Sequence, residues 1–562
     1  MGKLPFGGFF MEHINKKRVK GFAVFFAVMA VLLAARLAYI QIFCHDEFTA
    51  AAVSQYEITV EGLDTRGVIL DRNSMPLTGG VKEYYYIISR KLKDGRLKSL
   101  TEDIGGQQIA KKTSAYLVYR TESFDRDIND ILKKDYSAYV FQTSSRYSDD
   151  QLACHLIGYI NEDEKVGVSG IELMCQDRLA AAGSRLTIWA DAAGSLLRGI
   201  APSVEDVEGS VYGKEDDLRS QSSNMDERCV VTTIDRRLQY VCEKALESHT
   251  KSGAALITDC QTGEILAWAS SPTFDPNDIE SYLEDGDCLI NKVSQAAYAP
   301  GSVFKIVTAA AALENNVCGS DQVFECKGEV TVEGVTLGCS NAPEGGHGSL
   351  DMSQAMACSC NCYFAQLGEM IESGTIAAQA EKMGFGQTVL NNFPSETGGN
   401  IPGEDQVGPW DVSNLSIGQG DILATPLQIN QMTSIIAGGG KLVRPTIFLD
   451  EEDTRKEKEE ADAEQVVTPE TAASIEMMLA DVMTEGTGSI GWDIPVWGKT
   501  GTAEAEKDGL PVKNCWFTGY CRIEDKTYVI TVLAEDGASG SATALPVFKE
   551  ITEFLQETAR LE

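Results

Sequence analysis

Positive charge is scarce in this 562-residue sequence: 48 Lys and Arg residues face 83 Asp and Glu residues, for a formal net charge of -35. A surface with this balance repels phosphates, so we expect no nucleic-acid partner. An anionic substrate would have to be held by a few local cations. The sequence also lacks internal repeats and long low-complexity tracts, which argues against a repeat architecture.

The composition is otherwise that of a folded protein, with 43% hydrophobic and 23% charged residues. The length exceeds what one ordinary core accommodates, so at least two domains are expected. An acidic stretch at 203–227, poor in large apolar residues, predicts a linker. The almost wholly charged run at 450–464 predicts a solvated loop or helix face.

One long apolar run lies near the N-terminus. Residues 21–43 are enough to cross a bilayer as a helix. Basic residues between positions 16 and 20 precede the run, and Asp46 and Glu47 follow it, so we expect a cytoplasmic tail at 1–20 and an external body. A cleaved signal peptide is the alternative, but the run is long for one and no clear cleavage site follows it. The sequence therefore predicts a single-pass protein of the cell membrane.

The 15 cysteines show no repeating pattern. Cys326 and Cys339 flank a segment centred on Gly334 that alternates like a hairpin. If the body is external, these two cysteines are the best candidates for a disulfide.

A metal site is not expected. Cys358, Cys360 and Cys362 form a C-x-C-x-C run, but no partner cluster with ligand spacing accompanies it, so we interpret them as small buried thiols. His347 is interpreted as a surface or loop histidine, because neither metal nor triad spacing surrounds it.

Three short motifs occur in order in the second half of the chain. They are Ser302-Val303-Phe304-Lys305, Ser359-Cys360-Asn361 and Lys499-Thr500-Gly501-Thr502. The first two types arise by chance in chains of this size, but the ordered trio is the signature of penicillin-recognising serine enzymes.

The surroundings of Ser302 suit a nucleophile. Pro300 and Gly301 turn the chain, and an Ala-rich helical segment follows, so Ser302 lies at the first helical turn near unpaired N–H groups. Lys305 is one turn further on the same face, where its amine can reach the Ser302 hydroxyl. A lysine near other cations and away from water has a lowered pKa and can act as a general base.

The other two motifs supply supporting groups. Ser359 could relay a proton between Lys305 and a leaving amine, while Asn361 holds Lys305 and a substrate amide; the alternative is that these two residues only mark a turn. Lys499 would supply positive charge, although a solvated lysine on an edge strand is the simpler interpretation. Thr500 and Thr502 could bind a carboxylate, and Gly501 lets the strand backbone approach a substrate closely.

The chain resembles the class B penicillin-binding proteins over nearly its whole length. The segments that carry the resemblance, besides the trio, are Arg66 to Asn73, His155 to Tyr159, Gly170 to Glu172, Thr233 to Gln239, Tyr298 to Ser302, Ser416 to Gly420 and Thr425 to Gln428. Ala299 stands where the family commonly has a polar or acidic residue.

The resemblance implies an α+β penicillin-binding-protein transpeptidase fold, an antiparallel sheet flanked by helices, at 226–562. A mixed, β-containing non-catalytic domain at 44–225 and one transmembrane helix would precede it. Ser302 would attack a stem peptide ending in D-Ala-D-Ala, with the N–H groups of Ser302 and Thr502 as oxyanion hole, and pass the acyl group to a neighbouring amine. β-Lactams would acylate Ser302. No metal or organic cofactor is implied.

The resemblance leaves several functions open. No glycosyltransferase-like domain is present, which favours class B and implies a separate membrane glycosyltransferase as partner. A D,D-carboxypeptidase, a β-lactam-hydrolysing or β-lactam-sensing relative, and a scaffold of the wall-synthesis machinery are the alternatives. Neither the acceptor amine nor a role in elongation, division or sporulation follows from the sequence.

Overall fold

The computed structural model describes most of the chain. The described residues are 16–43, 57–63, 66–79, 82–108, 116–136, 138–161, 166–180, 184–189, 203–206, 211–212, 228–449 and 464–561, with gaps at 285, 333, 372, 391, 404–408 and 508. Most of the expected linker at 203–227 and of the charged run at 450–464 lies outside them. By internal contacts the chain divides into one unit of residues 1–63, 83–142 and 182–220 and a second unit of residues 64–82, 143–181 and 221–562.

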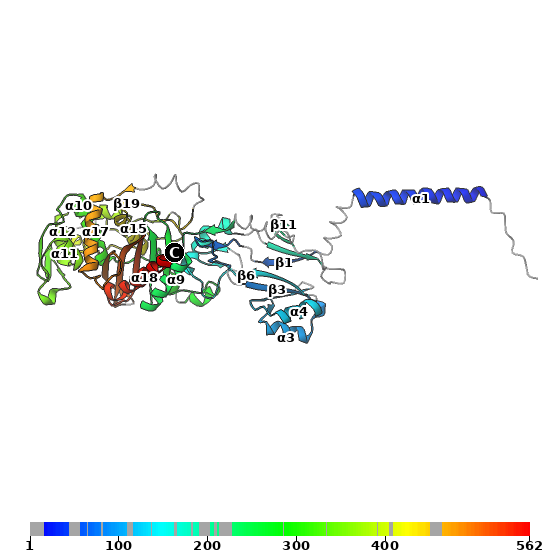
Figure 1. The fold of residues 1–562 in the computed structure, drawn as a ribbon, viewed down its shortest axis with the longest axis horizontal. Coiled ribbons are helices and arrows are strands. Elements are labelled where there is room, and N and C mark those ends of the chain that lie inside the picture. The colour runs from blue at the N-terminus through cyan, green and yellow to red at the C-terminus, as the bar shows by residue number, and fades with distance from the viewer. Residues whose placement is uncertain are drawn as a thin grey trace, which may run out of the picture. The chain divides into compact units, whose positions relative to one another are not determined.

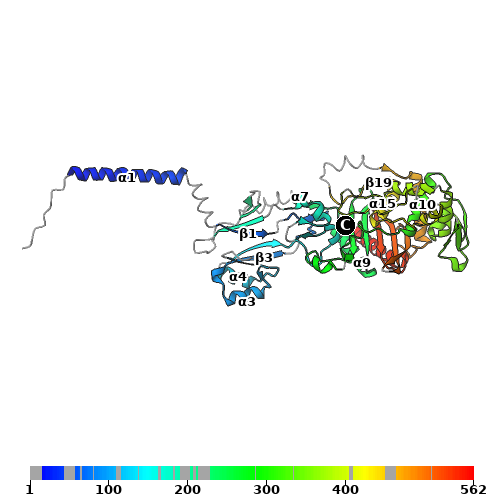
Figure 2. The same ribbon diagram turned by 180° about the vertical axis from the view of Figure 1, so that it is seen from behind.

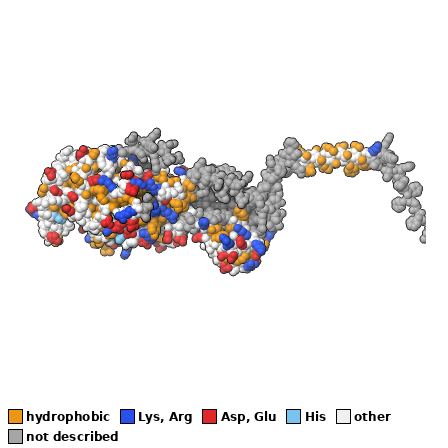
Figure 3. Space-filling view, viewed as in Figure 1, with side chains coloured by type: hydrophobic (Ala, Val, Ile, Leu, Met, Phe, Trp, Pro, Cys, Tyr) orange, Lys and Arg blue, Asp and Glu red, His pale blue; other side chains and the backbone are white. Residues whose placement is uncertain are grey.

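The expected apolar helix is present as α1 (Lys16–Phe43). Its segment Lys20–Tyr39 has a mean hydropathy of 2.2, and it is the one helix among the described residues that is long and apolar enough to span a membrane. Figure 3 shows hydrophobic side chains along its visible face. The helix therefore fits a single-pass anchor.

The first unit contains two four-stranded sheets with the strand orders β1-β9-β10-β11 and β4-β5-β3-β6. Tyr86 and Ile88 alternate along one face of β3 and pack with Leu97 of α3 and Leu132 of α4. Both helices therefore cover the same face of the second sheet (Figure 2). The elements are β1 (Glu57–Leu63), β3 (Lys82–Ser89), α3 (Gly95–Asp103), β4 (Gln107–Gln108), β5 (Tyr116–Thr121), α4 (Arg126–Asp135), β6 (Tyr139–Ser144), β9 (Ser184–Trp189), β10 (Ser203–Asp206) and β11 (Val211–Tyr212).

The second unit is built on a five-stranded sheet in the order β14-β13-β23-β22-β21, in which every neighbouring pair is antiparallel. The sequence pattern alone predicts two strands around a turn at 253–259 and 262–268 and a pair of strands at 516–520 and 528–534, and the structure confirms both pairs. The strands are β13 (Gly253–Asp259), β14 (Ile265–Ser271), β21 (Val496–Lys507), β22 (Leu510–Ile523) and β23 (Lys526–Ala534).

Helices cover both faces of this sheet (Figure 1). The ring of Phe517 in β22 packs 4.4 Å from that of Phe548 in α18 (Leu545–Leu561). The next residue, Thr518, meets Thr433 of α15 (Pro426–Ala437), with 2.7 Å between their hydroxyl oxygens. Because neighbouring strand residues point to opposite faces, α18 and α15 lie on opposite sides of the sheet.

This unit contains further helices and strands. They are β2 (Ile69–Leu70), α5 (Cys154–Ile157), β7 (Ile160–Asn161), β8 (Val166–Gly167), α6 (Gly170–Met174), α7 (Gln176–Leu179), β12 (Val230–Val231), α9 (Arg236–His249), η3 (Ile279–Tyr282), η4 (Gly286–Leu289), η5 (Gly301–Phe304), α10 (Lys305–Glu314), β15 (Phe324–Cys326), β16 (Glu329–Val332), β17 (Val335–Gly338), η6 (Ala342–Glu344), β18 (Gly348–Leu350), α11 (Met352–Ala357), α12 (Asn361–Met370), α13 (Ser373–Lys382), α14 (Pro409–Leu415), β19 (Lys441–Leu442), β20 (Glu464–Gln465), α17 (Pro469–Thr484) and η7 (Gly540–Ala544). The expected hairpin between Cys326 and Cys339 is formed by β16 and β17.

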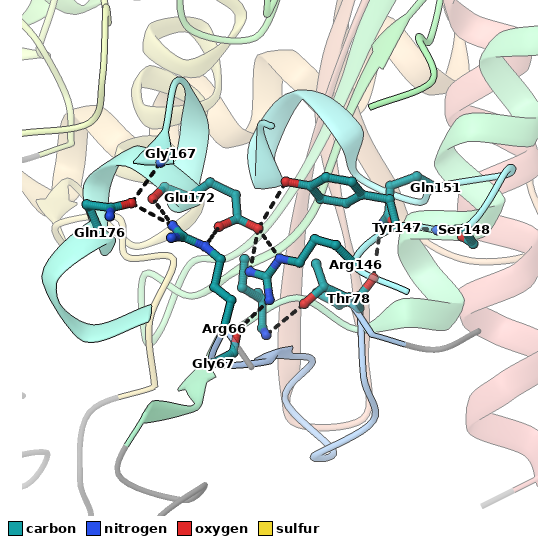
Figure 4. A network of polar contacts seen from close by, with 12 residues as sticks. Arg66, Gly67, Thr78, Arg146, Tyr147, Ser148, Gln151, Gly167, Glu172 and Gln176 are labelled. Atoms are coloured by element: carbon teal, nitrogen blue, oxygen red, sulfur yellow. Dashed lines mark hydrogen bonds and ion pairs between the residues drawn. The ribbon is translucent and has the colours of Figure 1, made fainter. Parts of the chain in front are cut away.

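A buried carboxylate holds the N-terminal segments of this unit together (Figure 4). Glu172, whose side chain is fully buried, accepts a hydrogen bond from Arg66 Nε at 2.5 Å and another from Arg146 Nε at 2.5 Å. The Tyr147 hydroxyl donates to the same carboxylate at 3.1 Å, and Arg146 also donates to the carbonyl of Gly67. Two guanidinium groups therefore share one carboxylate away from water.

This network joins two of the segments that resemble the family, since Arg66 and Glu172 are 106 residues apart. A second contact, the ion pair of Arg72 with Glu264 at 3.0 Å, ties the first of these segments to the start of β14. The segments 64–82 and 143–181 therefore belong to the second unit, together with residues 221–562. A single domain boundary near residue 226 stays a prediction.

The expected α+β architecture is confirmed: an antiparallel sheet flanked by helices, preceded by a mixed α and β N-terminal region and one apolar helix. Helices can cover both faces of the sheet because the central residues of β22 and β23 form nearly continuous buried runs.

Replacing Glu172 with Ala should lower the free energy of unfolding of this unit by about 3–5 kcal/mol, because two buried guanidinium groups lose their counter-charge. The measurement is the urea midpoint of the detergent-solubilised full chain. Glu553→Ala, which removes an exposed ion pair with Lys549, is the matched control and should cost less than about 1 kcal/mol. Equal effects of the two substitutions would contradict the assigned role of Glu172.

Candidate active site

The predicted nucleophile lies on a 3-10 turn that packs against β21. Ser302 belongs to η5 and is partly exposed, while Lys305 begins α10 and is fully buried. In a 3-10 turn, side chains three residues apart eclipse one another, so Ser302 and Lys305 share one side. Gly301 has φ +57°, and its N–H donates to Gly418 at 2.8 Å. The left-handed conformation of Gly301 sets the direction in which the chain enters the turn at Ser302.

Lys305 is held by the second motif. Its Nζ donates to the carbonyl oxygen of Ser359 at 2.8 Å, to the Oδ1 of Asn361 at 2.8 Å and to the Ser359 hydroxyl at 3.3 Å. The ring of Phe364 lies 5.5 Å from the same nitrogen. All three donor sites of the ammonium are thus directed at one loop.

Lys499 of β21 reaches the same hydroxyl. Its Nζ donates to Ser359 Oγ at 2.9 Å and to the carbonyl of Thr500 at 2.9 Å. Its side chain is fully buried, so the interpretation of a solvated edge-strand lysine is wrong although β21 is an edge strand. Lys305, Lys499 and Ser359 therefore form one cluster around a single oxygen atom.

Burial perturbs both lysines. It lowers the pKa of Lys305 to about 8, an effect that nearby thiols, Cys360 first, partly oppose. Burial also lowers the pKa of Lys499 well below its ordinary value, and the charge of Lys305 adds to this effect. Two ammonium groups that share one hydroxyl repel each other, so the cluster readily gives up one proton. A neutral lysine amine at moderate pH is what a general base requires.

The loop between α11 and α12 brings Ser359 and Asn361 into place. Ser359 adopts a left-handed conformation with φ +56°, which turns the chain between the two helices. The N–H of Cys360 donates to the carbonyl of Ala355 at 2.9 Å, and Asn361 Nδ2 donates to the carbonyl of Gly338 at 3.2 Å. The side chain of Asn361 therefore bridges Lys305 and the β16–β17 hairpin.

The third motif lines the other side of the nucleophile. A Cβ on Gly501 would lie 3.0 Å from Val303 Cγ1 and 3.1 Å from Trp516 Cβ, so a side chain there would push β21 away from η5. Thr500 and Thr502 lie on one face of the strand, since strand residues two apart share a face. The Thr500 hydroxyl pairs with that of Thr487 at 2.6 Å.

An open pocket of 1120 Å³ adjoins this site along β21. Its lining includes Ala299, Glu504, Glu506 and Glu535, but none of the eight predicted site residues. Glu535 is fixed by the Tyr298 hydroxyl at 2.5 Å. The carboxylates make this side of the site suited to a cationic or amine group rather than to an anion.

The structure thus brings the predicted residues of all three motifs together. The sequence did not reveal Gly418 as a support of the nucleophile's turn, nor Tyr298 and Glu535 as a pair. Gly418 and Tyr298 lie in segments that resemble the family, whereas no sequence signal singled out Glu535. Cys326 and Cys339, proposed as a disulfide, are instead free thiols.

Comparison with known proteins gives three findings. A family model described as the penicillin binding protein transpeptidase domain matches residues 253–553. The peptidoglycan D,D-transpeptidase PbpA of Mycobacterium tuberculosis is 30% identical over 359 residues, which covers 58% of this chain and 72% of that protein. Among solved structures, a chain from a study of polymerization and crosslinking by a peptidoglycan synthase complex has a TM-score of 0.69 and 22% identity, covering 95% of this chain and 97% of that chain.

A second solved structure is similar over the same region. Penicillin binding protein 3 of Mycobacterium tuberculosis, complexed with ampicillin, has a TM-score of 0.63 and 23% identity, covering 90% of this chain and 96% of that chain. At these identities the solved structures establish the fold, and the family model and PbpA carry the family relationship.

Gly418→Ala tests the support of the nucleophile's turn. A Cβ on Gly418 would lie 2.2 Å from the carbonyl oxygen of Gly301, so the substitution should displace Ser302 and slow its labelling by a fluorescent penicillin about 100-fold. Gly420→Ala is the matched control, because Gly420 also has positive φ (+88°) but its nearest heavy atom would be 3.6 Å away. Similar labelling rates for the two variants would show that the contact does not position Ser302.

Proposed function

This chain belongs to the class B penicillin-binding proteins, and on that premise we propose that it is a peptidoglycan D,D-transpeptidase that acts through a Ser302 acyl-enzyme. The observation that carries the proposal is the meeting of Lys305 and Lys499 at the Ser359 hydroxyl, beside the turn that bears Ser302. Relatives with this fold include a named D,D-transpeptidase and a protein complexed with ampicillin.

In the first half-reaction, Lys305 as the neutral amine takes the proton of the Ser302 hydroxyl while Ser302 attacks the carbonyl of the penultimate D-Ala. The fully buried amine is supported as the base by its lowered pKa and by its position one 3-10 turn from Ser302. Ser359, in contact with both lysines, passes a proton to the departing terminal D-Ala. The bond between the two D-Ala residues breaks, and an ester to Ser302 forms.

The oxyanion would be stabilised by the N–H groups of Ser302 and Thr502. In an antiparallel strand, the N–H and C=O of one residue point to the same edge. The carbonyl of Thr502 faces Gly301, 3.0 Å from where a Cβ on that glycine would lie, which supports an N–H of Thr502 directed to the same side. Loss of one such donor costs about 100- to 1000-fold in rate.

The substrate's terminal carboxylate is assigned to the strand side of the site. Thr500 and Thr502 provide hydroxyl donors on one face of β21, and Lys499 provides positive charge beside them. A chain of net charge -35 needs such a local cation to hold an anion. The acceptor amine would enter from the pocket lined by Glu504, Glu506 and Glu535, where carboxylates favour a cationic group.

The cellular setting follows from α1. We place the protein in the cell membrane through this single helix, with a cytoplasmic N-terminus and an extracellular catalytic domain, because basic residues precede the helix. A solved relative from work on a peptidoglycan synthase complex that polymerises and crosslinks supports a membrane glycosyltransferase as partner.

The nucleophile is tested by gel labelling of the purified full chain with a fluorescent penicillin. Wild type should be labelled covalently and Ser302→Ala should not, because the ester forms only at that hydroxyl. The matched control is Ser353→Ala, which removes a serine outside the site, hydrogen-bonded to Asp481 at 2.6 Å, and should keep the label. Label that persists on Ser302→Ala would identify another serine as the nucleophile.

Lipid-linked substrate then separates the related activities. Cross-linked product supports the transpeptidase, whereas release of D-Ala without cross-links would identify a D,D-carboxypeptidase. Rapid loss of the penicilloyl label with release of the opened drug would identify a β-lactam hydrolase. A folded wild type that takes no label would favour the scaffold.

The acylation rate should depend on pH through Lys305. The amine acts as base only when neutral, so the second-order rate constant should rise about tenfold per pH unit below about pH 8 and level off above it. Stopped-flow acylation between about pH 6 and pH 9.5 measures the profile, with thermal unfolding at each pH as control. A flat profile, or one that falls with rising pH, would contradict a neutral lysine as the base.

A further inference from the structure

Four potential metal ligands meet beside the loop that carries Ser359-Cys360-Asn361, called here the S-x-N loop. Cys326 ends β15, Cys339 follows β17, His347 precedes β18 and Cys360 caps the N-terminus of α12. Their ligand atoms all lie within 4.8 Å of one another. Residues from four separate places in the fold, spanning 35 positions of sequence, thus converge on one point.

The distances between these atoms fit a tetrahedron around a zinc ion. His347 Nδ1 lies 3.5 Å from Cys326 Sγ and 3.4 Å from Cys339 Sγ, and Cys339 Sγ lies 3.8 Å from Cys360 Sγ. Zinc bonds of about 2.3 Å to sulfur and about 2.0–2.1 Å to nitrogen place tetrahedral ligands about 3.8 Å apart for two sulfurs and about 3.5 Å apart for sulfur and nitrogen. These three distances match both values, and the other three pairs of ligand atoms lie within 4.8 Å.

Packing of free thiols or a disulfide explains this cluster less well. The three thiols are nearly fully buried, at 2%, 6% and 0% exposure, yet they face a half-buried imidazole and one another instead of apolar side chains alone. The 3.8 Å between Cys339 and Cys360 is far longer than a disulfide bond of about 2.05 Å. The backbone N–H of Tyr363 points at Cys360 Sγ at 3.4 Å, as suits a thiolate.

Tight glycine turns bring the ligand-bearing segments this close. Gly346, with φ +94°, lies so near the chain that a Cβ would fall 2.2 Å from the carbonyl oxygen of Cys326. Gly328, with φ +92°, accepts a hydrogen bond at its carbonyl from the N–H of Cys339 at 2.8 Å. The backbone therefore brings the ligand-bearing segments close together.

We propose that Cys326, Cys339, His347 and Cys360 bind one divalent metal ion, with zinc the best match to a set of three thiolates and one imidazole. Four protein ligands close the coordination shell, so the ion is structural rather than catalytic. Metal binding of this kind does not depend on the proposed transpeptidase activity.

The ion would nevertheless fix part of the active site. Cys360 lies between Ser359 and Asn361, the two residues that hold Lys305. Asn361 also donates to the carbonyl of Gly338, the neighbour of Cys339. A metal bound at these cysteines ties the hairpin to the S-x-N loop from both sides, so it fixes Ser359 and Asn361 relative to Lys305.

Metal content is the first test. The full chain, purified in detergent with a thiol reductant and without chelator, should carry about one zinc per chain by mass spectrometry of the metal. Cys339→Ala and His347→Ala should each lower the content at least about tenfold. Cys358→Ala is the matched control from the same C-x-C-x-C run. Its Sγ lies 4.0 Å from the carbonyl oxygen of Ala355, outside the group of four ligands, and zinc should be retained.

A second measurement does not need the variants to fold. Wild type stripped with a chelator and given Co²⁺ should show intense thiolate-to-cobalt charge-transfer absorption with a tetrahedral ligand-field pattern, which Zn²⁺ displaces. Reduced wild type that carries no metal and takes up neither ion overturns the proposal. Zinc that survives both Cys339→Ala and His347→Ala, or a Cys339–Cys360 disulfide in metal-free protein, overturns it as well.

The link to the active site has its own readout. Chelation should slow penicillin acylation of the folded chain at least about tenfold, and added Zn²⁺ should restore the rate. Zinc binding with an unchanged acylation rate would overturn the positioning role. Absence of acylation in the zinc-loaded wild type would instead count against the proposed function, because metal content is measured separately.

Discussion

Two buried ammonium groups meet at one serine hydroxyl, and much of the second unit serves to hold them there. Lys305 comes from the start of α10 and Lys499 from β21, and both donate to Ser359. Removing a lysine from water is costly, and placing a second one beside it costs more. Hydrogen bonds to the surrounding carbonyls and to the Asn361 oxygen offset part of this cost. The rest of the cost lowers the pKa values of Lys305 and Lys499. The chemistry of the site depends on these lowered pKa values, because a general base must be neutral.

A second group of buried charges, in which the charges have opposite signs, lies outside the site. Glu172 is a single buried carboxylate between Arg66 and Arg146, and it ties together segments of the second unit that are distant in sequence. Here the charges are complementary, so the network stabilises the packing instead of priming a reaction. The segments that resemble the family near the N-terminus are thus explained by structure, since they supply the parts of this network.

The S-x-N loop lies between the two buried lysines and the cluster of cysteines and His347. It receives Lys305 and Lys499 on one side, and on the other its Cys360 faces Cys326, Cys339 and His347. A loop with a left-handed residue at its centre needs support from its neighbours to keep that conformation. Hydrogen bonds to α11 and to the β16–β17 hairpin provide part of it, and the proposed metal would provide the rest.

The sequence by itself determined the chemistry-bearing motifs, the apolar helix and several of the central strands, because each depends on residues that are close together in the chain. Ser302 and Lys305 are three positions apart, and a helical turn suffices to align them. Local spacing also predicted the hairpin between Cys326 and Cys339. Their pairing as a disulfide was wrong, since the partners of each sulfur lie elsewhere.

Only the tertiary structure decided which distant groups meet. The sequence predicted Lys499 as a cation of the site, but its burial and its contact with Ser359 follow from the S-x-N loop 140 residues earlier. His347 and Cys360 showed no ligand spacing, because the four ligand positions come from two strand ends, a loop and a helix cap. Periodicity and short motifs report on neighbours along the chain, whereas burial, shared protons and converging ligands arise from how the sheet, the hairpins and the helices pack.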